Sequence, residues 1–248
     1  MFDASTTGMY DTLRLTSSRM GSWCPAALLG AAIIGTLMLC SWDTWWVPLE
    51  KSFFSLEEGI TMASYAAASY CPPDALTNWT CDRCTAERVE RFVPTAIIFD
   101  DVWNLQAFVG YSPQLNSVLA VFRGTREGSR TNWIHNLMTS TTRVRYPGMP
   151  DKAMVHDGFY RSWTRSVLQQ QVNDAIHAAR AGQDLPVVVI GHSLGGALAT
   201  LCAAQLVTEF NLTAVRLYTF GCPRVGNSVF AKALANTMLI NTRVTHNR

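Results

Sequence analysis

Three observations predict that most of this 248-residue chain forms an α/β domain with a mostly parallel central sheet and helices on both faces. First, helical and strand-like segments alternate from Lys51 onward, the pattern of helix-covered parallel sheets. Second, Pro186–Ile190 (PVVVI) is an uninterrupted apolar run, typical of a parallel strand buried on both faces. Third, the composition is 48% hydrophobic and only 15% charged, which indicates a large core and excludes an intrinsically disordered chain.

Capping residues and breaker residues locate the elements of the first half. A helix begins at Leu56, because Ser55–Glu58 (SLEE) is a capping box, and it is interrupted at Cys71–Pro73 (CPP). Strands are expected where apolar and β-branched residues lie between Pro, Gly and Asn, at 95–99, 105–111 and 117–123.

The second half continues the alternation. One long helix is predicted from His156 to Arg180, with Gly182 as its stop. Its apolar residues recur at helical spacing: Phe159, Trp163, Val167, Val172 and Ile176. After the central strand, the sequence predicts three further elements, namely helix 194–209, strand 215–220 and helix 227–239.

The charge pattern and the absence of repeats exclude other classes of protein. The net charge is +2 and the 20 Lys and Arg are scattered, so the chain has no electrostatic footprint for nucleic acid. The sequence contains no internal repeat of the kind that forms a solenoid, so this architecture is not expected. The pair Cys81 and Cys84 has neither the second cysteine pair nor the nearby histidine that a structural zinc site needs. No metal or organic cofactor is implied.

The N-terminus contains a membrane-type segment. Residues 21–42 carry no charge, while Arg14 and Arg19 precede them, which places residues 1–22 in the cytosol and everything after Trp42 on the far side. Two interpretations stay open, a cleaved signal peptide and an uncleaved anchor over residues 23–42. A poor cleavage site and three nearby tryptophans favour the anchor: Trp42, Trp45 and Trp46.

Either interpretation makes the domain at 52–248 lumenal, extracellular or secreted. Asn78 and Asn211 begin N-x-S/T sequons, which are usable as glycosylation sites only on that side of a membrane. Sequons also occur by chance, so they support this localisation weakly.

The cysteines fit an oxidising compartment. Cys81 and Cys84 are expected to form a local disulfide. Cys202 and Cys222 are expected to be buried thiols, and Cys71 has no evident partner in the sequence.

The strongest chemical motif lies where the central strand meets a helix. Gly191–Gly195 (GHSLG) fits the G-x-S-x-G nucleophile elbow, in which a sharp turn lifts the serine out of the sheet. Glycines two residues before and after Ser193 supply the space for that turn. Because an apolar strand precedes the motif and an Ala/Leu-rich helix follows it, the alternative of a glycine-rich turn with a spectator serine is disfavoured.

Four motifs in the same order resemble the fungal-type class 3 lipases, an α/β-hydrolase family. They are Val121–Thr125 (VFRGT), Val155–Phe159 (VHDGF), Gly191–Ala197 (GHSLGGA) and Tyr218–Asn227 (YTFGCPRVGN). The resemblance extends from about Ser52 to Arg248 and implies an α/β-hydrolase fold. It also implies that Ser193 is the nucleophile, and that Thr125 and the backbone N–H of Leu194 form the oxyanion hole.

The segment between residues 126 and 150 covers the family's lid. It carries four apolar residues on one helical face: Trp133, Ile134, Leu137 and Met138. A short hinged helix that exposes such a face favours binding to a lipid surface and long-chain lipid esters. An ordinary amphipathic surface helix is the alternative interpretation.

The catalytic triad is where this sequence departs from the family. The fold supplies an acid and then a base after the serine, but the only candidates after Ser193 are Glu209 and His246. Glu209 lies roughly 24 Å along the predicted helix, too far to orient a base beside the serine. His192 is interpreted as a packed turn residue, and His135 and His156 precede the nucleophile.

The resemblance offers one explanation for this departure. Thr242–Arg248 (TRVTHNR) resembles the strand that leads into the family's catalytic aspartate, and the family's histidine and the partner of the cysteine matching Cys71 lie further on. We therefore expect a C-terminally truncated form, and assign no catalytic role to His246.

The sequence thus predicts an acylglycerol (triacylglycerol-type) lipase that acts through a serine acyl-enzyme. Its partner is a lipid ester at a membrane or droplet surface, with membrane association through the N-terminal segment. Two alternatives stay open, a phospholipase A1-type esterase and a non-catalytic, membrane-anchored protein that binds lipid surfaces.

Overall fold

The computed structural model describes residues 55–126, 140–238 and 240–245. All of them belong to the second of two units into which the chain divides, Glu50–Arg248. The predicted membrane segment and the four apolar lid residues, Trp133, Ile134, Leu137 and Met138, lie outside the described residues. Within the described ranges, no helix combines the length and the hydrophobicity needed to cross a bilayer.

A six-stranded sheet in the order β1-β2-β3-β6-β7-β8 forms the centre of this unit. Its strands are β1 Val93–Asp100, β2 Leu105–Ser112, β3 Ser117–Phe122, β6 Val187–His192, β7 Val215–Phe220 and β8 Ile240–Val244. From β3 to β8 each strand is parallel to its neighbours, whereas β1 and β2 join as an antiparallel hairpin that pairs antiparallel with β3. The predicted mostly parallel sheet is confirmed, with this antiparallel edge added.

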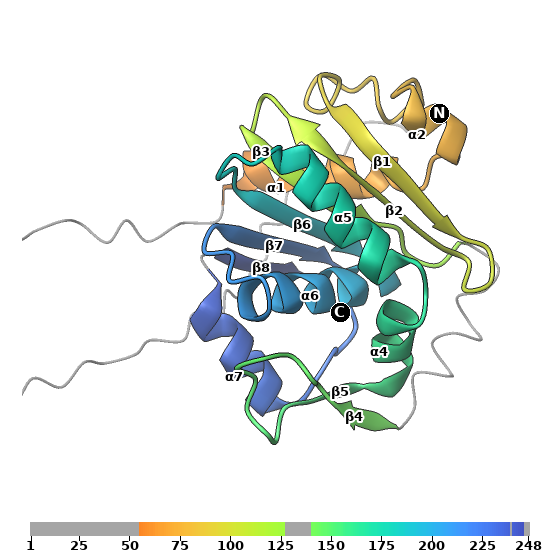
Figure 1. Cartoon of the computed structure of the whole chain (residues 1–248). Helices are drawn as coiled ribbons and strands as arrows, with labels where there is room; N and C mark the ends of the chain where they lie inside the picture. Colours follow the sequence, from red (N-terminus) through yellow and green to blue (C-terminus); the bar gives the residue numbers. More distant parts are fainter. Residues whose placement is uncertain (1–54, 127–139, 239, 246–248) are drawn as a thin grey trace, which may run out of the picture. The chain divides into compact units, whose positions relative to one another are not determined.

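Helices cover both faces of the sheet (Figure 1). They are α1 Leu56–Ala68, α2 Pro73–Thr77, α4 Asp157–Thr164, α5 Leu168–Arg180, α6 Leu194–Thr208 and α7 Ser228–Thr237. Helix α1 packs on one face, while α5 and α6 pack on the other. A second, two-stranded sheet consists of β4 Thr141–Arg143 and β5 Met154–His156.

The central strand β6 is buried on both faces, as its apolar run predicts. Val188 and Ile190 belong to the core beneath α1, whereas Val187 and Val189 belong to the core beneath α5 and α6. All four side chains are at most 1% exposed. Because neither face of β6 meets water, alternating polar residues are absent from this strand.

The single helix predicted from His156 to Arg180 is wrong: the structure has two helices, α4 and α5, separated at residues 165–167. The break is held by a tertiary contact. Asp100, at the end of β1, accepts a hydrogen bond from the Val167 backbone N–H at 3.0 Å. The Ser166 hydroxyl oxygen accepts one from the Leu168 N–H at 3.3 Å. These side chains satisfy amides that would otherwise bond within a continuous helix.

Most other predicted elements are confirmed within a few residues. The capping box forms as expected, with the Ser55 hydroxyl oxygen accepting a hydrogen bond from the Glu58 N–H. Sequence patterns missed the short helix α2, which begins at Pro73 after the predicted break, and the short strands β4 and β5. Proline suits the first turn of a helix, so the break starts a new element.

Candidate active site

The predicted elbow is a strained turn between β6 and α6. Ser193 is the N-cap of α6, with φ 54° and ψ −124°, outside the regions that L-residues usually adopt. Two backbone hydrogen bonds hold it there: the Ser193 N–H donates to the Phe220 carbonyl, and the Gly196 N–H donates to the Ser193 carbonyl, both at 2.9 Å. The strain is the cost of presenting this serine at the carboxyl end of the sheet.

Glycines allow the backbones around Ser193 to approach closely. A Cβ on Gly191 would lie 2.6 Å from the Gly196 nitrogen, and a Cβ on Gly195 would lie 2.8 Å from the Arg123 carbonyl carbon. A Cβ on Gly124 would lie 3.1 Å from the Ser193 Cβ. The end of β3 is therefore in contact with the elbow, and this contact brings the predicted oxyanion-hole segment to the serine.

Thr125 follows Gly124, which lies against Ser193, and Leu194 directly follows Ser193. The Thr125 hydroxyl oxygen is buried and has no hydrogen-bond partner in the part of the chain that the structure describes. Leu194 is the first residue of α6, and its side chain is buried. A buried hydroxyl without a partner is costly, and a helix N-terminus carries partial positive charge, so both features favour an anionic oxygen at this position.

Two residues before Thr125, the buried side chain of Arg123 anchors the end of β3. Its guanidinium donates to the Gln106 side-chain oxygen at 2.9 Å and to the Asn104 carbonyl at 2.7 Å, and it lies over the Phe99 ring. Burial lowers the pKa of Arg123, and no carboxylate among the described residues forms an ion pair with it. The sequence motif contains this arginine but gives no sign of its polar neighbours.

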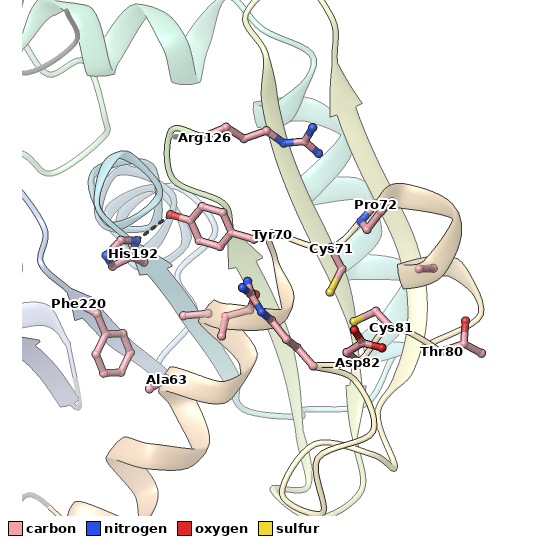
Figure 2. Close-up of a pocket in the computed structure, with 14 residues that line it drawn as sticks. Ala63, Tyr70, Cys71, Pro72, Thr80, Cys81, Asp82, Arg126, His192 and Phe220 are labelled. Atoms are coloured by element: carbon pink, nitrogen blue, oxygen red, sulfur yellow. Dashed lines mark hydrogen bonds between the residues drawn. The ribbon is translucent and has the colours of Figure 1, made fainter. Parts of the chain in front are cut away.

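On its other side, the elbow is in contact with the end of α1. The Tyr70 hydroxyl and His192 Nδ1 lie 2.7 Å apart, and Figure 2 shows the two side chains pointing toward each other. They line a pocket of about 1090 Å³ whose charged residues are Asp82, Arg83 and Arg126. The interpretation of His192 as a packed turn residue agrees with this contact. Its partner Tyr70 was not identified from sequence, because 122 residues separate the two.

The described candidates for an acid and a base have hydrogen-bond partners away from Ser193. Glu209 is the C-cap of α6 and accepts a hydrogen bond from the Gln205 side chain at 2.7 Å, so it lies at the far end of that helix. His156 is the N-cap of α4, where its Nδ1 accepts from the Phe159 N–H. His135 and His246 lie outside the described residues.

The remaining predicted modifications involve surface turns and cysteines. Asn78 and Asn211 are both exposed, a condition for the glycosylation that their sequons predict. The disulfide between Cys81 and Cys84 is confirmed. The two remaining predicted thiols are also confirmed, since Cys202 and Cys222 are free and buried.

Cys222 makes the stability of the domain sensitive to alkaline pH. Burial raises its thiol pKa from about 9 to about 11, so the thiol stays neutral in the folded state while the unfolded chain ionises. The contribution of this neutral thiol to the free energy of unfolding is complete below pH 9 and is lost as the pH rises through 11. A difference of two pKa units corresponds to a loss of about 2–3 kcal/mol. Unfolding by urea at pH 8 and pH 10.5 should therefore show a smaller pH-dependent loss for Cys222→Ala than for the parent.

Cys222→Ala should still lose some free energy of unfolding at alkaline pH, because burial also raises the pKa values of Cys202 and Tyr218. If the parent and Cys222→Ala lost the same free energy of unfolding between pH 8 and pH 10.5, the pH dependence could not be assigned to Cys222. The constant offset from the smaller alanine side chain does not affect the comparison.

The fold and the elbow define the chain as an α/β-hydrolase with a serine at the strand-to-helix turn. Residues 119–248 match the family described as Lipase (class 3). The chain belongs to this family, which confirms the resemblance.

Several fungal lipases are similar to the chain. It is 32% identical to a lipase of Rhizomucor miehei over 74% of this chain and 49% of the relative. It is 29% identical to the secreted mono- and diacylglycerol lipase A of Penicillium camembertii over 73% and 59% of the two chains. The chain thus spans about half the length of these curated relatives.

Solved structures of fungal lipases are also similar to the structure of this chain. The triacylglyceride lipase of Rhizomucor miehei superposes with a TM-score of 0.67 at 27% identity, covering 78% of this chain and 71% of that one. Lipase II of Rhizopus niveus superposes with a TM-score of 0.69 at 26% identity, over 78% and 72% of the two chains. This similarity confirms the predicted α/β-hydrolase fold.

Proposed function

We propose that the protein is a serine carboxylic-ester hydrolase of the acylglycerol lipase type, with Ser193 as its nucleophile. The observation that carries the proposal is the strained elbow, which holds Ser193 against Gly124; the next residue, Thr125, has a buried hydroxyl with no partner among the described residues. In the reaction, the Ser193 oxygen loses its proton and bonds to the ester carbonyl carbon, and the carbonyl oxygen becomes an oxyanion. The carbonyl then re-forms as the bond to the leaving oxygen breaks, and that oxygen takes up the proton and leaves as the alcohol. Water then hydrolyses the acyl-serine.

The oxyanion hole consists of the Thr125 hydroxyl and the Leu194 backbone N–H. Each such donor typically contributes about 3–4 kcal/mol in the transition state, because it is fixed before charge develops on the oxygen. The N-terminus of α6 adds its partial positive charge at the same point.

Three observations support acylglycerols at a lipid surface as the substrate. The relatives' names include mono- and diacylglycerol lipases and triacylglyceride lipases. Two exposed apolar side chains, Val102 at 91% and Trp103 at 38%, lie at the turn of the β1–β2 hairpin. This turn is at the end of the sheet where β3 meets the elbow, since Ala107 of β2 pairs with Phe122. The predicted lid adds four apolar residues.

The proposal extends to localisation. A secreted relative and the disulfide between Cys81 and Cys84 support a secreted, lumenal or extracellular domain. The anchor or signal peptide at residues 23–42 and the glycosylation of Asn78 and Asn211 are parts of the same proposal.

A phospholipase A1-type activity uses the same machinery, since the elbow does not select the head group. A non-catalytic lipid-surface protein is favoured by a different observation: the described candidates for an acid and a base, Glu209 and His156, have hydrogen-bond partners away from Ser193. The first candidate differs from the proposal in the lipid that it hydrolyses, and the second differs because it hydrolyses no ester.

Mass spectrometry of the acyl-enzyme tests the proposal. After incubation with p-nitrophenyl butyrate and an acid quench, we expect a butyryl group on the peptide that contains Ser193, and no such peptide from Ser193→Ala. Thr125→Val, which keeps the shape but removes the hydroxyl, should reduce the initial rate of labelling roughly 100-fold or more. Labelling of both parent and Ser193→Ala at another residue, or no labelling with added imidazole as base, would favour the non-catalytic protein.

A further inference from the structure

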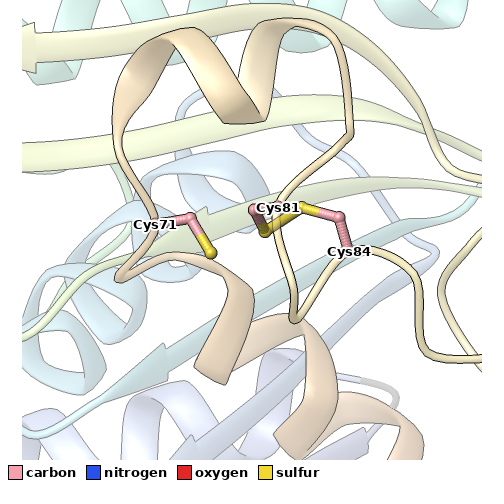
Figure 3. Close-up of side chains that lie close together, drawn as sticks. All are labelled: Cys71, Cys81 and Cys84. Atoms are coloured by element: carbon pink, nitrogen blue, oxygen red, sulfur yellow. A yellow bond between two sulfur atoms is a disulfide. The ribbon is translucent and has the colours of Figure 1, made fainter.

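A polar pocket lies among the helices that cover the α5 and α6 face of the sheet. Its volume is about 430 Å³, and its lining residues come from α4, α5, the end of α6 and the segment that follows β4. Every side chain that lines it carries a nitrogen or oxygen atom. The pocket beside the elbow and the disulfide between Cys81 and Cys84 (Figure 3) belong to the opposite face, where α1 packs. The two pockets are therefore separate.

The side-chain amide of Gln205, on α6, is the centre of the pocket wall. Its oxygen accepts hydrogen bonds from the Trp163 indole N–H at 3.2 Å and from the Gln169 amide at 3.1 Å. The Asn173 amide nitrogen donates to the same oxygen at 3.5 Å, and the Gln205 nitrogen donates to the Glu209 carboxylate at 2.7 Å. Because the nitrogen of Asn173 is the atom that bonds to Gln205, its side-chain oxygen is left for another partner.

Two buried polar atoms of the pocket wall have no partner among the described residues. They are the Asn173 side-chain oxygen and the Tyr146 hydroxyl, whose residues are 8% and 6% exposed. Trp163 is a further neighbour of Tyr146, but an indole N–H only donates and cannot accept the proton of the tyrosine. Because a buried polar group without a partner is costly, a ligand that bonds to both atoms gains affinity from them.

The hydrogen-bonding needs of these two atoms indicate the class of ligand. The Asn173 oxygen can only accept. Burial raises the pKa of Tyr146 well above its ordinary value, so its hydroxyl keeps its proton and is available as a donor. An ammonium group only donates and a carboxylate only accepts, whereas a hydroxyl group does both. The two charged residues of the lining, Arg145 and Glu209, have opposite signs, so the pocket has no net charge that would select an ion.

We propose that this pocket binds a neutral polyhydroxylated molecule, which is a small free polyol or a sugar residue. One ligand hydroxyl donates to the Asn173 oxygen, and a second accepts from the Tyr146 hydroxyl. The exposed Glu209 carboxylate and the half-buried Gln169 amide are available for further hydroxyls. The half-buried ring of Tyr160, also in the lining, supplies an apolar face for the C–H groups of the ligand.

Binding at this pocket is separate from the chemistry at Ser193. Gln205 follows Ser193 by twelve residues on α6, which corresponds to roughly 18 Å along the helix. A polyol bound beside Gln205 therefore does not contact the elbow. The proposal does not depend on whether the protein hydrolyses esters.

Saturation-transfer difference NMR of the whole 248-residue chain tests the proposal. The chain is kept in micelles of a polyoxyethylene detergent, because this detergent has no sugar head group that could occupy the pocket. The probes are glycerol and methyl α-D-glucopyranoside, each titrated separately. We expect saturation transfer to at least one probe, and its affinity should fall roughly 3- to 10-fold in Tyr146→Phe and in Asn173→Leu, since each variant removes one hydrogen bond.

The two probes distinguish the sources of the ligand. Transfer to glycerol alone supports a small free polyol, and transfer to the glucoside supports a sugar residue. No transfer to either probe, or equal affinities in the parent, Tyr146→Phe and Asn173→Leu, would overturn the proposal. Tighter binding of glucuronate, which carries a carboxylate, than of the glucoside would also overturn it.

Two controls separate lost binding from lost folding. Tyr111→Phe removes a hydroxyl that bonds to Asn116 in the β2–β3 turn, and it should leave the affinity for the probe unchanged. Tyr146→Phe should not lower the free energy of unfolding in probe-free buffer, because its hydroxyl has no bond to a described residue to lose. A clear fall in that free energy would show that the hydroxyl is already bonded within the fold, and would contradict its role as a ligand donor.

Discussion

The 248-residue chain is expected to hydrolyse p-nitrophenyl butyrate roughly four to six orders of magnitude more slowly than a serine hydrolase with a complete triad. Acylation of Ser193 needs a base oriented by a carboxylate. Among the described residues, the hydrogen bonds of the candidate bases lead elsewhere: His192 Nδ1 to Tyr70, and His156 Nδ1 to the Phe159 N–H. Residual turnover should come from the oxyanion hole alone.

Added imidazole provides a sharp measurement of this effect. A small base that reaches the half-buried Ser193 should raise the rate in proportion to its concentration, and Ser193→Ala should respond only as much as buffer does. The variant also corrects for direct hydrolysis of the ester by imidazole. Fast turnover without imidazole that Ser193→Ala abolishes would contradict the prediction and direct attention to His135 and His156 as bases.

Gly195→Ala is expected to lower the free energy of unfolding by about 2–3 kcal/mol, although alanine is the better helix former. Gly195 lies in the first turn of α6, where the helical preference for alanine is worth at most about 1 kcal/mol. Against this gain, the added Cβ would lie 2.8 Å from the Arg123 carbonyl carbon. Because this neighbour is backbone directly after β3, the clash cannot be relieved by a side-chain rotation, and the end of β3 must separate from the elbow.

Urea denaturation with a matched control checks this prediction. Gly148 lies in a turn with φ 75° and nothing within 4 Å of a built Cβ, so Gly148→Ala should cost only about 1 kcal/mol from the left-handed backbone. Gly195→Ala should also slow acylation of Ser193, since Gly124 and Thr125 would move with β3. Equal unfolding free energies for the two variants would show that the approach of β3 to α6 is not tightly constrained.

Local spacing was enough to predict the parts of the fold that are decided by neighbours in sequence. The apolar run of β6, the capping box at Ser55 and the short loop between Cys81 and Cys84 each contain their own cause within a few residues. The prediction of one long helix from His156 to Arg180 was wrong because its cause of interruption lies far away in the sequence. Its amphipathic spacing is continuous through Val167, but the residue that interrupts it, Asp100, comes from a hairpin 67 residues away.

The candidate site divides in the same way. The sequence by itself determined the elbow, because a serine between Gly191 and Gly195 after a buried strand has few other conformations. Only the tertiary structure decided the contacts around it: the Tyr70 hydroxyl on His192, and Gly124 against Ser193. Such contacts join segments that are distant in sequence, so no local pattern predicts them. A strained turn, in contrast, depends on the residues that form it, and the sequence shows those residues directly.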